Sequence, residues 1–291
     1  MRTRSLHGGR HELGQNFLVH RPAIDTIVGL VAETDGPILE IGAGDGALTL
    51  PLARLGRSLQ AIDLDEHRVA RLRRRLPGVD VRHADALRHP VERPVVVGNL
   101  PFHLTTPLLR RLLDARAWQH AIVLTQWEVA RKRAGVGGGT MMTAQAAPWF
   151  EFELHGRVPA AGFRPQPSVD GGILALRRRA SPLVAEAGRA SYERFVAAAF
   201  TARGRGLAEV LRSAGRADPH RVREALGQAG VESHRLPRDL DAAQWVALWA
   251  ALVDDPSGGA GGRSGRGGRG GRGGRGAGPA TGRRTSGRRI R

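Results

Sequence analysis

A glycine-rich turn and an acidic residue stand where a nucleoside can be held. The apolar run from Pro37 to Ile41 leads into Gly42-Ala-Gly44, and a helix is predicted to follow. Glycines between a strand and a helix let the backbone approach a ligand closely, and N–H groups at the helix start meet its anionic end. Asp63 ends the next predicted strand, where a carboxylate can accept both hydroxyls of a ribose. The pattern predicts a nucleoside-containing cofactor, either NAD or S-adenosylmethionine; a turn without a ligand is the alternative.

A second motif, Asn99-Leu-Pro-Phe102, follows a later predicted strand and has the parts needed to methylate an amino group on an aromatic base. Such an amine is a poor nucleophile, because its lone pair is delocalised into the ring. The side-chain carbonyl of Asn99 and the main-chain carbonyl of Leu100 can accept its two N–H bonds and orient the lone pair. Pro101 restricts the backbone, and Phe102 can stack on the base. The alternative is a strand-ending turn with a buried phenylalanine, but the order of the motifs after Asp63 favours methyl transfer.

Alternating strands and helices must bring both motifs to one edge of a sheet. Strands are predicted over 37–41, 59–63, 79–82, 94–98 and 121–125, and helices over 20–33, 47–55, 67–76 and 106–113. This alternation predicts a parallel sheet with helices on both faces. Beyond residue 180 only helical spacing remains, around 192–200, 219–228 and 240–252. We therefore expect a small helical domain over 181–255, with Trp245 and Trp249 in its core rather than stacked on bases.

The charge distribution points to a polyanionic partner or a membrane surface. The 291 residues carry a formal net charge of +18, and Lys132 is the one lysine among 45 basic residues. Glycine and arginine dominate residues 256–291, so we expect a disordered tail. It is either an arm that grips RNA phosphate or an extension without a role; a collagen repeat is excluded because the period is mostly Gly-Gly-Arg. Residues 1–15 are expected to form a flexible basic N-terminus.

Several classes of protein are excluded by what the sequence lacks. It contains no cysteine, which removes disulfides, Cys-ligated zinc, iron–sulfur clusters and thiol nucleophiles. The 11 histidines form no metal-binding motif, so no metal is expected. The sequence has no apolar stretch long enough to span a membrane and no secretory signal at its start. A cytoplasmic protein with no membrane partner is the expectation.

The motifs together resemble the erythromycin-resistance (Erm) rRNA adenine N6-methyltransferases, within the wider rRNA adenine dimethylase family. The resemblance covers about residues 10–255. The segments that carry it are Gly14-Gln-Asn-Phe-Leu18, Glu40-Ile-Gly-Ala-Gly-Asp-Gly46, Asn99-Leu-Pro-Phe102 and Phe163-Arg-Pro-Gln-Pro-Ser-Val-Asp170. Asp63 stands where the family usually has Glu, and Phe102 where many members have Tyr.

The resemblance implies a Rossmann-like methyltransferase domain over 16–180 that uses S-adenosyl-L-methionine, followed by a helical rRNA-binding domain over 181–255. It also implies roles for individual residues. The expected cofactor contacts are Asn16, Leu18, Gly42, Gly44, Asp63, Asp85 and Asn99. The expected catalytic residues are Asn99, Leu100, Pro101 and Phe102, with Phe163 as a second wall of the target-base pocket.

The resemblance implies an adenine in the peptidyl-transferase loop of 23S rRNA as target. The segment Gln126-Trp-Glu-Val-Ala-Arg-Lys-Arg133 is more similar to Erm proteins than to the small-subunit (16S) rRNA dimethylases, which are the alternative. The expected substrate is nascent or protein-free 23S rRNA, domain V, and the expected enzyme is a monomer that confers resistance to macrolide, lincosamide and streptogramin B drugs. Two other classes compete. A nicotinamide-dependent dehydrogenase lacks an evident hydride-transfer site, and a non-catalytic RNA-binding protein leaves the cofactor motifs without purpose.

Overall fold

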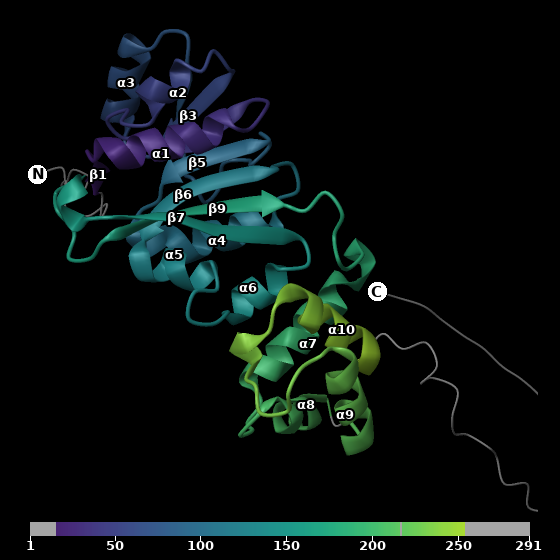
Figure 1. The fold of residues 1–291 in the computed structure, drawn as a ribbon. Coiled ribbons are helices and arrows are strands. Elements are labelled where there is room, and N and C mark those ends of the chain that lie inside the picture. Colours follow the sequence, from purple (N-terminus) through teal and green to yellow (C-terminus); the bar gives the residue numbers. More distant parts are fainter. Residues whose placement is uncertain (1–15, 216, 254–291) are drawn as a thin grey trace, which may run out of the picture. The chain divides into compact units, whose positions relative to one another are not determined.

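A sheet of seven strands organises the chain, whose computed structural model describes residues 16–215 and 217–253 (Figure 1). The strand order is β4-β3-β2-β5-β6-β9-β7, and a separate pair joins β1 to β8. The strands are β1 (Phe17–Leu18), β2 (Ile38–Ile41), β3 (Leu59–Asp63), β4 (Asp80–His83), β5 (Val95–Asn99), β6 (His120–Gln126), β7 (Phe150–Val158), β8 (Phe163–Arg164) and β9 (Gly171–Arg178). None of the described helices combines the length and apolar character needed to cross a membrane.

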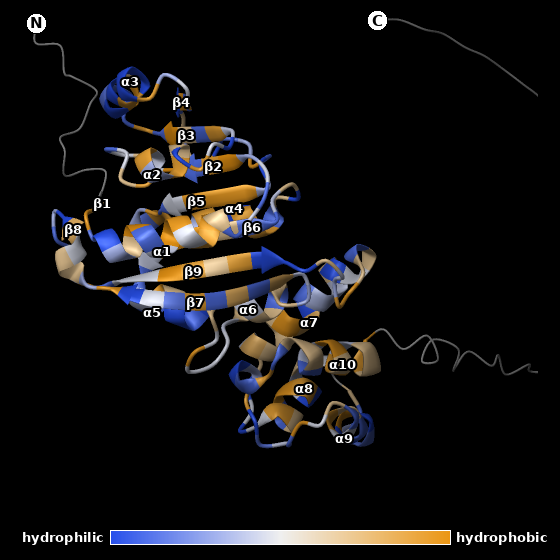
Figure 2. Ribbon diagram, turned by 45° about the horizontal axis from the view of Figure 1, so that its top comes forward, coloured by the Kyte–Doolittle hydropathy of each residue, from blue (hydrophilic) through white to orange (hydrophobic). Residues whose placement is uncertain are grey.

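The first five strands of the sheet, β4 to β6 in that order, are parallel, as the alternation of strands and helices predicts. The apolar runs of β2, β3, β5 and β6 are buried on both faces, because helices cover the two sides, whereas the edge strand β4 exposes Arg82 and His83. Three helices connect strands of this part of the sheet, namely α2 (Thr49–Ala53), α3 (Glu66–Arg75) and α4 (Thr105–Asp114), and α1 (Arg21–Ala32) precedes β2. In Figure 2 the central strands β2, β5 and β9 are mostly hydrophobic, whereas the arginine-rich α3 is mostly hydrophilic. Each of the five parallel strands lies within one or two residues of its predicted range.

Two antiparallel strands complete the sheet and were not predicted from the sequence. β9 pairs antiparallel with β6, from His120↔Arg177 to Gln126↔Gly171, and β7 pairs antiparallel with β9. β7 is an edge strand with many charged side chains, so its apolar pattern is weak. The pairing partner of β9 is distant in the chain, and local periodicity does not show it.

Two short helices lie between β6 and β7, and the last described part of the chain, after β9, is helical. The elements are α5 (Trp127–Arg133), α6 (Met141–Ala146), α7 (Arg189–Thr201), α8 (Leu207–Gly215), α9 (Pro219–Gln228) and α10 (Ala242–Leu252). Trp149 packs edge-to-face on Tyr192 at 5.7 Å between ring centroids, and Tyr192 packs likewise on Trp249 at 6.0 Å. Trp245 and Trp249 are buried, which confirms that they belong to the core. One apolar cluster therefore runs from the sheet into α7–α10.

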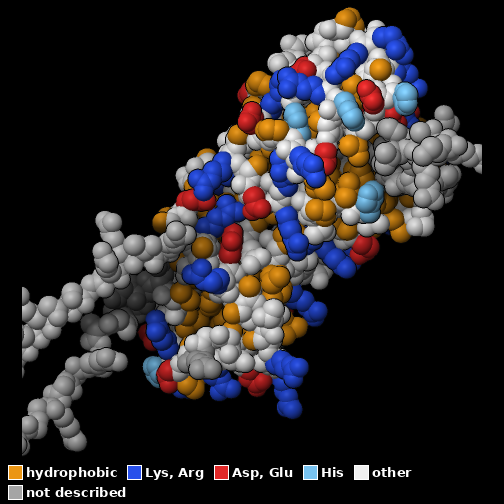
Figure 3. All heavy atoms as spheres, turned by 180° about the vertical axis from the view of Figure 1, so that it is seen from behind, with side chains coloured by type: hydrophobic (Ala, Val, Ile, Leu, Met, Phe, Trp, Pro, Cys, Tyr) orange, Lys and Arg blue, Asp and Glu red, His pale blue; other side chains and the backbone are white. Residues whose placement is uncertain are grey.

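The predicted domain limits at residues 180 and 255 stay predictions. The helices α7–α10 fall inside the range 181–255, and β2–β9 fall inside 16–180. The predicted N-terminal segment 1–15 and the Gly/Arg-rich segment 256–291 lie outside the described residues. On the described surface, arginine side chains are spread over the face that Figure 3 shows, in keeping with the basic composition.

Candidate functional site

The glycine turn lies directly after β2 and is held by hydrogen bonds to β3. Gly42 and Gly44 have φ of +76° and +54°, a conformation that glycine adopts without strain. The amides of Gly42 and Ala43 both donate to the carbonyl of Ile62, at 2.9 and 3.0 Å. A Cβ at Gly44 would lie 3.2 Å from the ring of Phe17. Hydrogen bonds to β3 thus shape the turn, and the ring of Phe17 leaves little space for a side chain at position 44.

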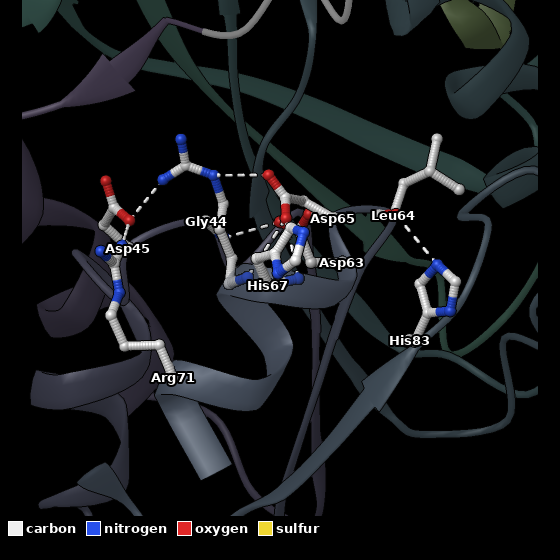
Figure 4. A network of polar contacts seen from close by, with 9 residues as sticks. Gly44, Asp45, Asp63, Leu64, Asp65, His67, Arg71 and His83 are labelled. Atoms are coloured by element: carbon white, nitrogen blue, oxygen red, sulfur yellow. Dashed lines mark hydrogen bonds and ion pairs between the residues drawn. The ribbon is translucent and has the colours of Figure 1, made fainter. Parts of the chain in front are cut away.

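Asp63 at the end of β3 is tied to the glycine turn. Its Oδ2 accepts a hydrogen bond of 2.7 Å from the amide of Gly44, and its Oδ1 accepts one of 2.8 Å from the amide of Asp65 (Figure 4). Its side chain lines a cavity although the residue is only 4 % exposed. The sequence predicts a ribose acceptor here; the structure adds that the same carboxylate positions the turn. Each oxygen keeps a second lone pair for a ligand hydroxyl.

Basic side chains of α3 surround the acidic end of the glycine turn. Arg68 and Arg71 both form ion pairs with Asp45, and Arg68 also pairs with Asp65 at 3.1 Å (Figure 4). The guanidinium of Arg68 lies 4.1 Å from the centroid of the Phe17 ring. These contacts fix the turn, α3 and the segment before α1 together.

The segment Asn16–Leu18 lies over the glycine turn and brings two of the predicted cofactor contacts there. It pairs antiparallel with β8, as Phe17↔Arg164 and Leu18↔Phe163. The side-chain amide of Asn99 donates a hydrogen bond of 2.7 Å to the main-chain carbonyl of Asn16. Gly14, the first residue of the motif that the resemblance indicated, lies outside the described residues.

Two adjoining cavities open at this edge of the sheet. One, of about 50 Å³, is lined by residues of the segment before α1, the glycine turn and the Asn99 motif, namely Asn16, Phe17, Gly42, Gly44, Asp63, Asn99, Leu100, Pro101 and Phe102. The other, of about 200 Å³, is lined by residues that include Leu18, Glu40 and Arg164. Four residues line both cavities: Phe17, Gly42, Gly44 and Asn99. The structure therefore gathers the predicted cofactor contacts around one site, Asp85 excepted.

Asp85 lines neither cavity. It lies just past β4, where its Oδ1 accepts a hydrogen bond of 2.8 Å from the amide of Leu87. Its other oxygen pairs with Arg88 at 3.7 Å. β4 is the neighbour of β3 in the sheet, so Asp85 stands near the Asp63 end of the site. Its contact with cofactor stays a prediction.

Glu40 is a site residue that the sequence analysis quoted within a motif but gave no role. It lies in β2, is 1 % exposed and lines the larger cavity, and its Oε2 has no hydrogen-bond partner among the described residues. Burial and, to a lesser degree, the nearby carboxylate of Asp63 raise the pKa of Glu40 to about 8, although hydrogen bonding with Thr49 opposes the rise. A buried carboxyl oxygen without a partner favours a cationic or N–H-donating ligand. An acidic residue inside an otherwise apolar strand is the signal that marks it in the sequence.

The backbone of the Asn99 motif is fixed by its neighbours and leaves two carbonyl oxygens free. The amide of Leu100 donates to the carbonyl of Leu124 at 2.9 Å, and the carbonyl of Pro101 accepts from the amide of Leu104 at 2.9 Å. A main-chain carbonyl can only accept, so the bond from Asn99 to Asn16 fixes the NH₂ side of the Asn99 amide and turns its Oδ1 away. Within the described residues, no donor is paired with that Oδ1 or with the carbonyl of Leu100.

The aromatic rings of Phe102 and Phe163 meet edge-to-face. Their centroids lie 6.2 Å apart at an interplanar angle of 72°. Phe102 is half-buried and lines the smaller cavity, whereas Phe163 is fully buried behind it. The ring of Phe102 is thus the one that reaches the cavity, and Phe163 backs it. The role of Phe163 as a wall for the target base stays a prediction.

A metal centre finds no support in the described part of the chain. The structure brings no three His, Cys, Asp or Glu side chains there into an arrangement that could hold a metal ion. The site consists of amide and carbonyl groups, three acidic residues, one arginine and aromatic rings, which suit an organic ligand.

Comparison with known proteins identifies relatives along most of the chain. The family model described as "Ribosomal RNA adenine dimethylase" matches residues 6–253. An rRNA adenine N-6-methyltransferase of Corynebacterium diphtheriae is 53 % identical over 211 residues, 71 % of this chain and 83 % of the relative. The mycinamicin-resistance protein MyrB of Micromonospora griseorubida is 49 % identical over 247 residues, 83 % of this chain and 78 % of the relative. The crystal structure of the 23S rRNA methyltransferase ErmE matches with a TM-score of 0.74 and 34 % identity, over 81 % of this chain and 99 % of that one.

Proposed function

Because the chain belongs to the ribosomal RNA adenine dimethylase family, we propose that it transfers methyl groups from S-adenosylmethionine to N6 of one adenine in 23S rRNA. The observation that carries this proposal is the pair of free carbonyl oxygens on Asn99 and Leu100 at the edge of the cavity. An exocyclic amine has two N–H bonds, and these two acceptors match them. The relatives indicate the class of substrate: one is named as an rRNA adenine N-6-methyltransferase, and the other as a mycinamicin-resistance protein.

The residues around the two cavities fit S-adenosylmethionine. Asp63 presents a carboxylate to ribose hydroxyls, and Gly44 has no room for a side chain between the turn and Phe17. The unpartnered Oε2 of Glu40 lines the larger cavity, where it suits the ammonium group of the methionine part. When bound, S-adenosylmethionine supplies a sulfonium methyl group. The family is one of S-adenosylmethionine-dependent methyltransferases.

The chain's own residues then prepare the adenine. The Oδ1 of Asn99 and the carbonyl of Leu100 accept the two N–H bonds of the amine and turn its lone pair out of the ring plane. The ring of Phe102 stacks on the base and favours the positive charge that develops on it. No general base is needed, because the nitrogen becomes acidic once alkylated and its proton can then leave to water.

As the target we propose an adenine of the peptidyl-transferase loop in domain V. ErmE is named as a 23S rRNA methyltransferase, and it shares 34 % identity over nearly its whole length with this chain. A methyl group on N6 there would crowd the shared site of macrolide, lincosamide and streptogramin B drugs and so confer resistance. The substrate is nascent or protein-free rRNA, and the enzyme acts as a monomer in the cytoplasm.

Primer extension tests this proposal directly. Protein-free 23S and 16S rRNA are incubated separately with the enzyme and S-adenosylmethionine, and each is then copied by reverse transcriptase. A stop at one adenine of domain V supports the proposal. A stop only in 16S rRNA assigns the chain to the small-subunit dimethylases instead. No incorporation of methyl label from S-adenosylmethionine into either RNA contradicts both, because a single N6 methyl group does not stop reverse transcriptase.

A further inference from the structure

Trp127 differs from the other tryptophans of this chain. The sequence has five, and Trp118, Trp149, Trp245 and Trp249 are at most 6 % exposed. Trp127, the first residue of α5, is only half-buried. An indole that reaches the surface of a basic protein is well suited to stack on a nucleic-acid base.

The position of Trp127 relates it to the proposed target-base pocket through β9. A Cβ on Gly171 would lie 2.8 Å from Cζ of Phe163, and a Cβ on Gly172 would lie 3.2 Å from Cε3 of Trp127. Successive residues of a strand face opposite sides of a sheet, so the two rings flank the start of β9 from its two faces. Phe163 in turn packs on Phe102. Trp127 therefore lies at the same end of β9 as the ring that backs the target-base site, on the opposite face of the sheet.

The positively charged side chain of Arg157 lies beside the indole of Trp127. Its guanidinium carbon lies 5.4 Å from the centroid of an indole ring of Trp127, and its Nε donates to Oδ2 of Asp170 at 2.6 Å. Arg157 is 60 % exposed, and Asp170 engages only its Nε, which leaves the two terminal nitrogens of the guanidinium for another acceptor. Asp170 also accepts from the amide of Trp127 through its main-chain carbonyl, at 2.8 Å. One aspartate thus positions both members of the pair.

We propose that Trp127 and Arg157 bind the nucleotide next to the target adenine in the RNA chain. The base of that nucleotide stacks on the exposed part of the indole and on the guanidinium of Arg157. The terminal nitrogens of Arg157 donate to the adjoining phosphate. This inference rests on the proposed function, since it takes the adenine to lie against Phe102. The proposed contact holds the RNA strand next to the target adenine.

Intrinsic fluorescence tests the stacking without any turnover. Titration with a short RNA hairpin that carries the target adenine should quench the emission of the wild-type protein, because a stacked base quenches an indole. The variant Trp127→Phe should bind the hairpin nearly as well, since a phenyl ring also stacks, but its remaining emission should not change. The control Trp249→Phe, in the buried core, should keep the RNA-dependent quenching. Quenching that persists in Trp127→Phe would overturn the proposal.

Kinetics with altered RNA test the position of the contact. Trp127→Leu keeps an apolar side chain beside Gly172 and loses the aromatic face, so KM for the hairpin should rise roughly tenfold while kcat changes little. The nucleotide on the 5′ side of the target adenine, and in a second RNA the one on the 3′ side, is replaced by an abasic nucleotide. One of the two replacements should weaken RNA binding by the wild type and cause no further loss of affinity in Trp127→Leu. Arg157→Met should lower the salt dependence of binding by about one phosphate contact.

The outcomes of the two experiments separate this inference from the function on which it rests. Equal RNA affinity of Trp127→Leu and wild type, or an abasic penalty that is the same in both, overturns the nucleotide contact and leaves the methyltransferase intact. A wild-type enzyme that methylates no rRNA overturns the proposed function itself. Should Trp127→Leu fail to fold, the fluorescence of Trp127→Phe decides the matter.

Discussion

The side-chain amide of Asn99 donates a hydrogen bond of 2.7 Å to the main-chain carbonyl of Asn16, a residue 83 positions away in the chain. This bond joins the end of β5 to the segment before α1. It also decides which way the Asn99 amide faces, because a carbonyl partner requires the NH₂ side. The oxygen that remains is the proposed acceptor for the target amine, so the segment that covers the cofactor cavity also orients the methylation site.

Replacing Asn99 by Ala should abolish methyl transfer while S-adenosylmethionine binding is weakened but still measurable. The variant loses the oxygen that holds the amine and the bond to Asn16, whereas Asp63 and the glycine turn keep their own contacts. Methyl incorporation into 23S rRNA and calorimetric titration with cofactor measure the two effects. Near-native turnover of the variant would contradict the role of Asn99.

Phe102→Tyr should remain active, and Phe102→Ala should lose much of its rate. The ring of Phe102 lines the cavity and is backed by Phe163 at 6.2 Å, so an aromatic face is in place for the base. Base–aromatic stacking contributes about 1–3 kcal/mol, which corresponds to a loss of roughly 5- to 150-fold. Single-turnover methylation of a domain V hairpin checks this. If the alanine variant matches the wild type, the ring is only a packing element.

Asp63→Ala should raise the dissociation constant for S-adenosylmethionine and also destabilise the free protein. The carboxylate is buried and accepts from the amides of Gly44 and Asp65, and both donors would lose a charged acceptor. Leaving a buried donor unsatisfied costs about 1–3 kcal/mol. Thermal unfolding with and without cofactor separates the two effects.

The matched variants for this position are Asp63→Glu and Asp63→Asn. Glutamate is the usual residue of the family here, so Asp63→Glu should retain cofactor binding. Asparagine keeps the size but sets an NH₂ group against one of two amide donors, so it should loosen the turn. Unchanged cofactor affinity in Asp63→Ala would place the ribose elsewhere.

Glu40→Gln should stabilise the cofactor-free protein above neutral pH and weaken cofactor binding. Burial raises the pKa of Glu40 from 4.5 to about 8, so the folded state holds a proton that the unfolded state releases. The contribution of this group to stability is complete below pH 4.5 and is lost as the pH rises toward 8, by about 1.4 kcal/mol per pH unit. Glutamine carries no titrating proton and removes this slope. Unfolding midpoints of both proteins between pH 5 and 8.5 test it, and parallel curves would show that Glu40 is not buried as a neutral acid.

Deleting residues 257–291 should preserve cofactor binding and catalysis on the same adenine. The deleted segment is rich in glycine and arginine and has almost no side chain that can bury apolar area. Its arginines add electrostatic affinity for RNA, so the truncated protein should bind more weakly and with a shallower salt dependence. Methylation of a domain V hairpin across a salt series measures this, together with the thermal midpoint. Identical salt slopes would show that the segment is not an RNA-binding arm.

The local pattern was sufficient to predict the parallel half of the fold. β3 and α9 match their predicted ranges fully, and β2, β4, β5 and β6 match within one or two residues. Buried parallel strands are continuous apolar runs, and each helix between them repeats its apolar residues at helical spacing. The short helices α5, α6 and α8 and the strands β7 and β9 were not predicted, because their apolar patterns are short or interrupted.

By itself, the sequence determined the order of the motifs and the residue types that each motif brings: a glycine turn, an acidic strand end and an amide beside an aromatic ring. These are properties of short segments, so they can be read locally. Only the tertiary structure decided how the segments meet. The bond from Asn99 to Asn16, the packing of Phe102 on Phe163 and the placement of Trp127 beside β9 all join residues far apart in the chain. Such contacts depend on the register of β9 against β6 and of β1 against β8, and strand pairing between distant segments leaves no periodic trace in either one.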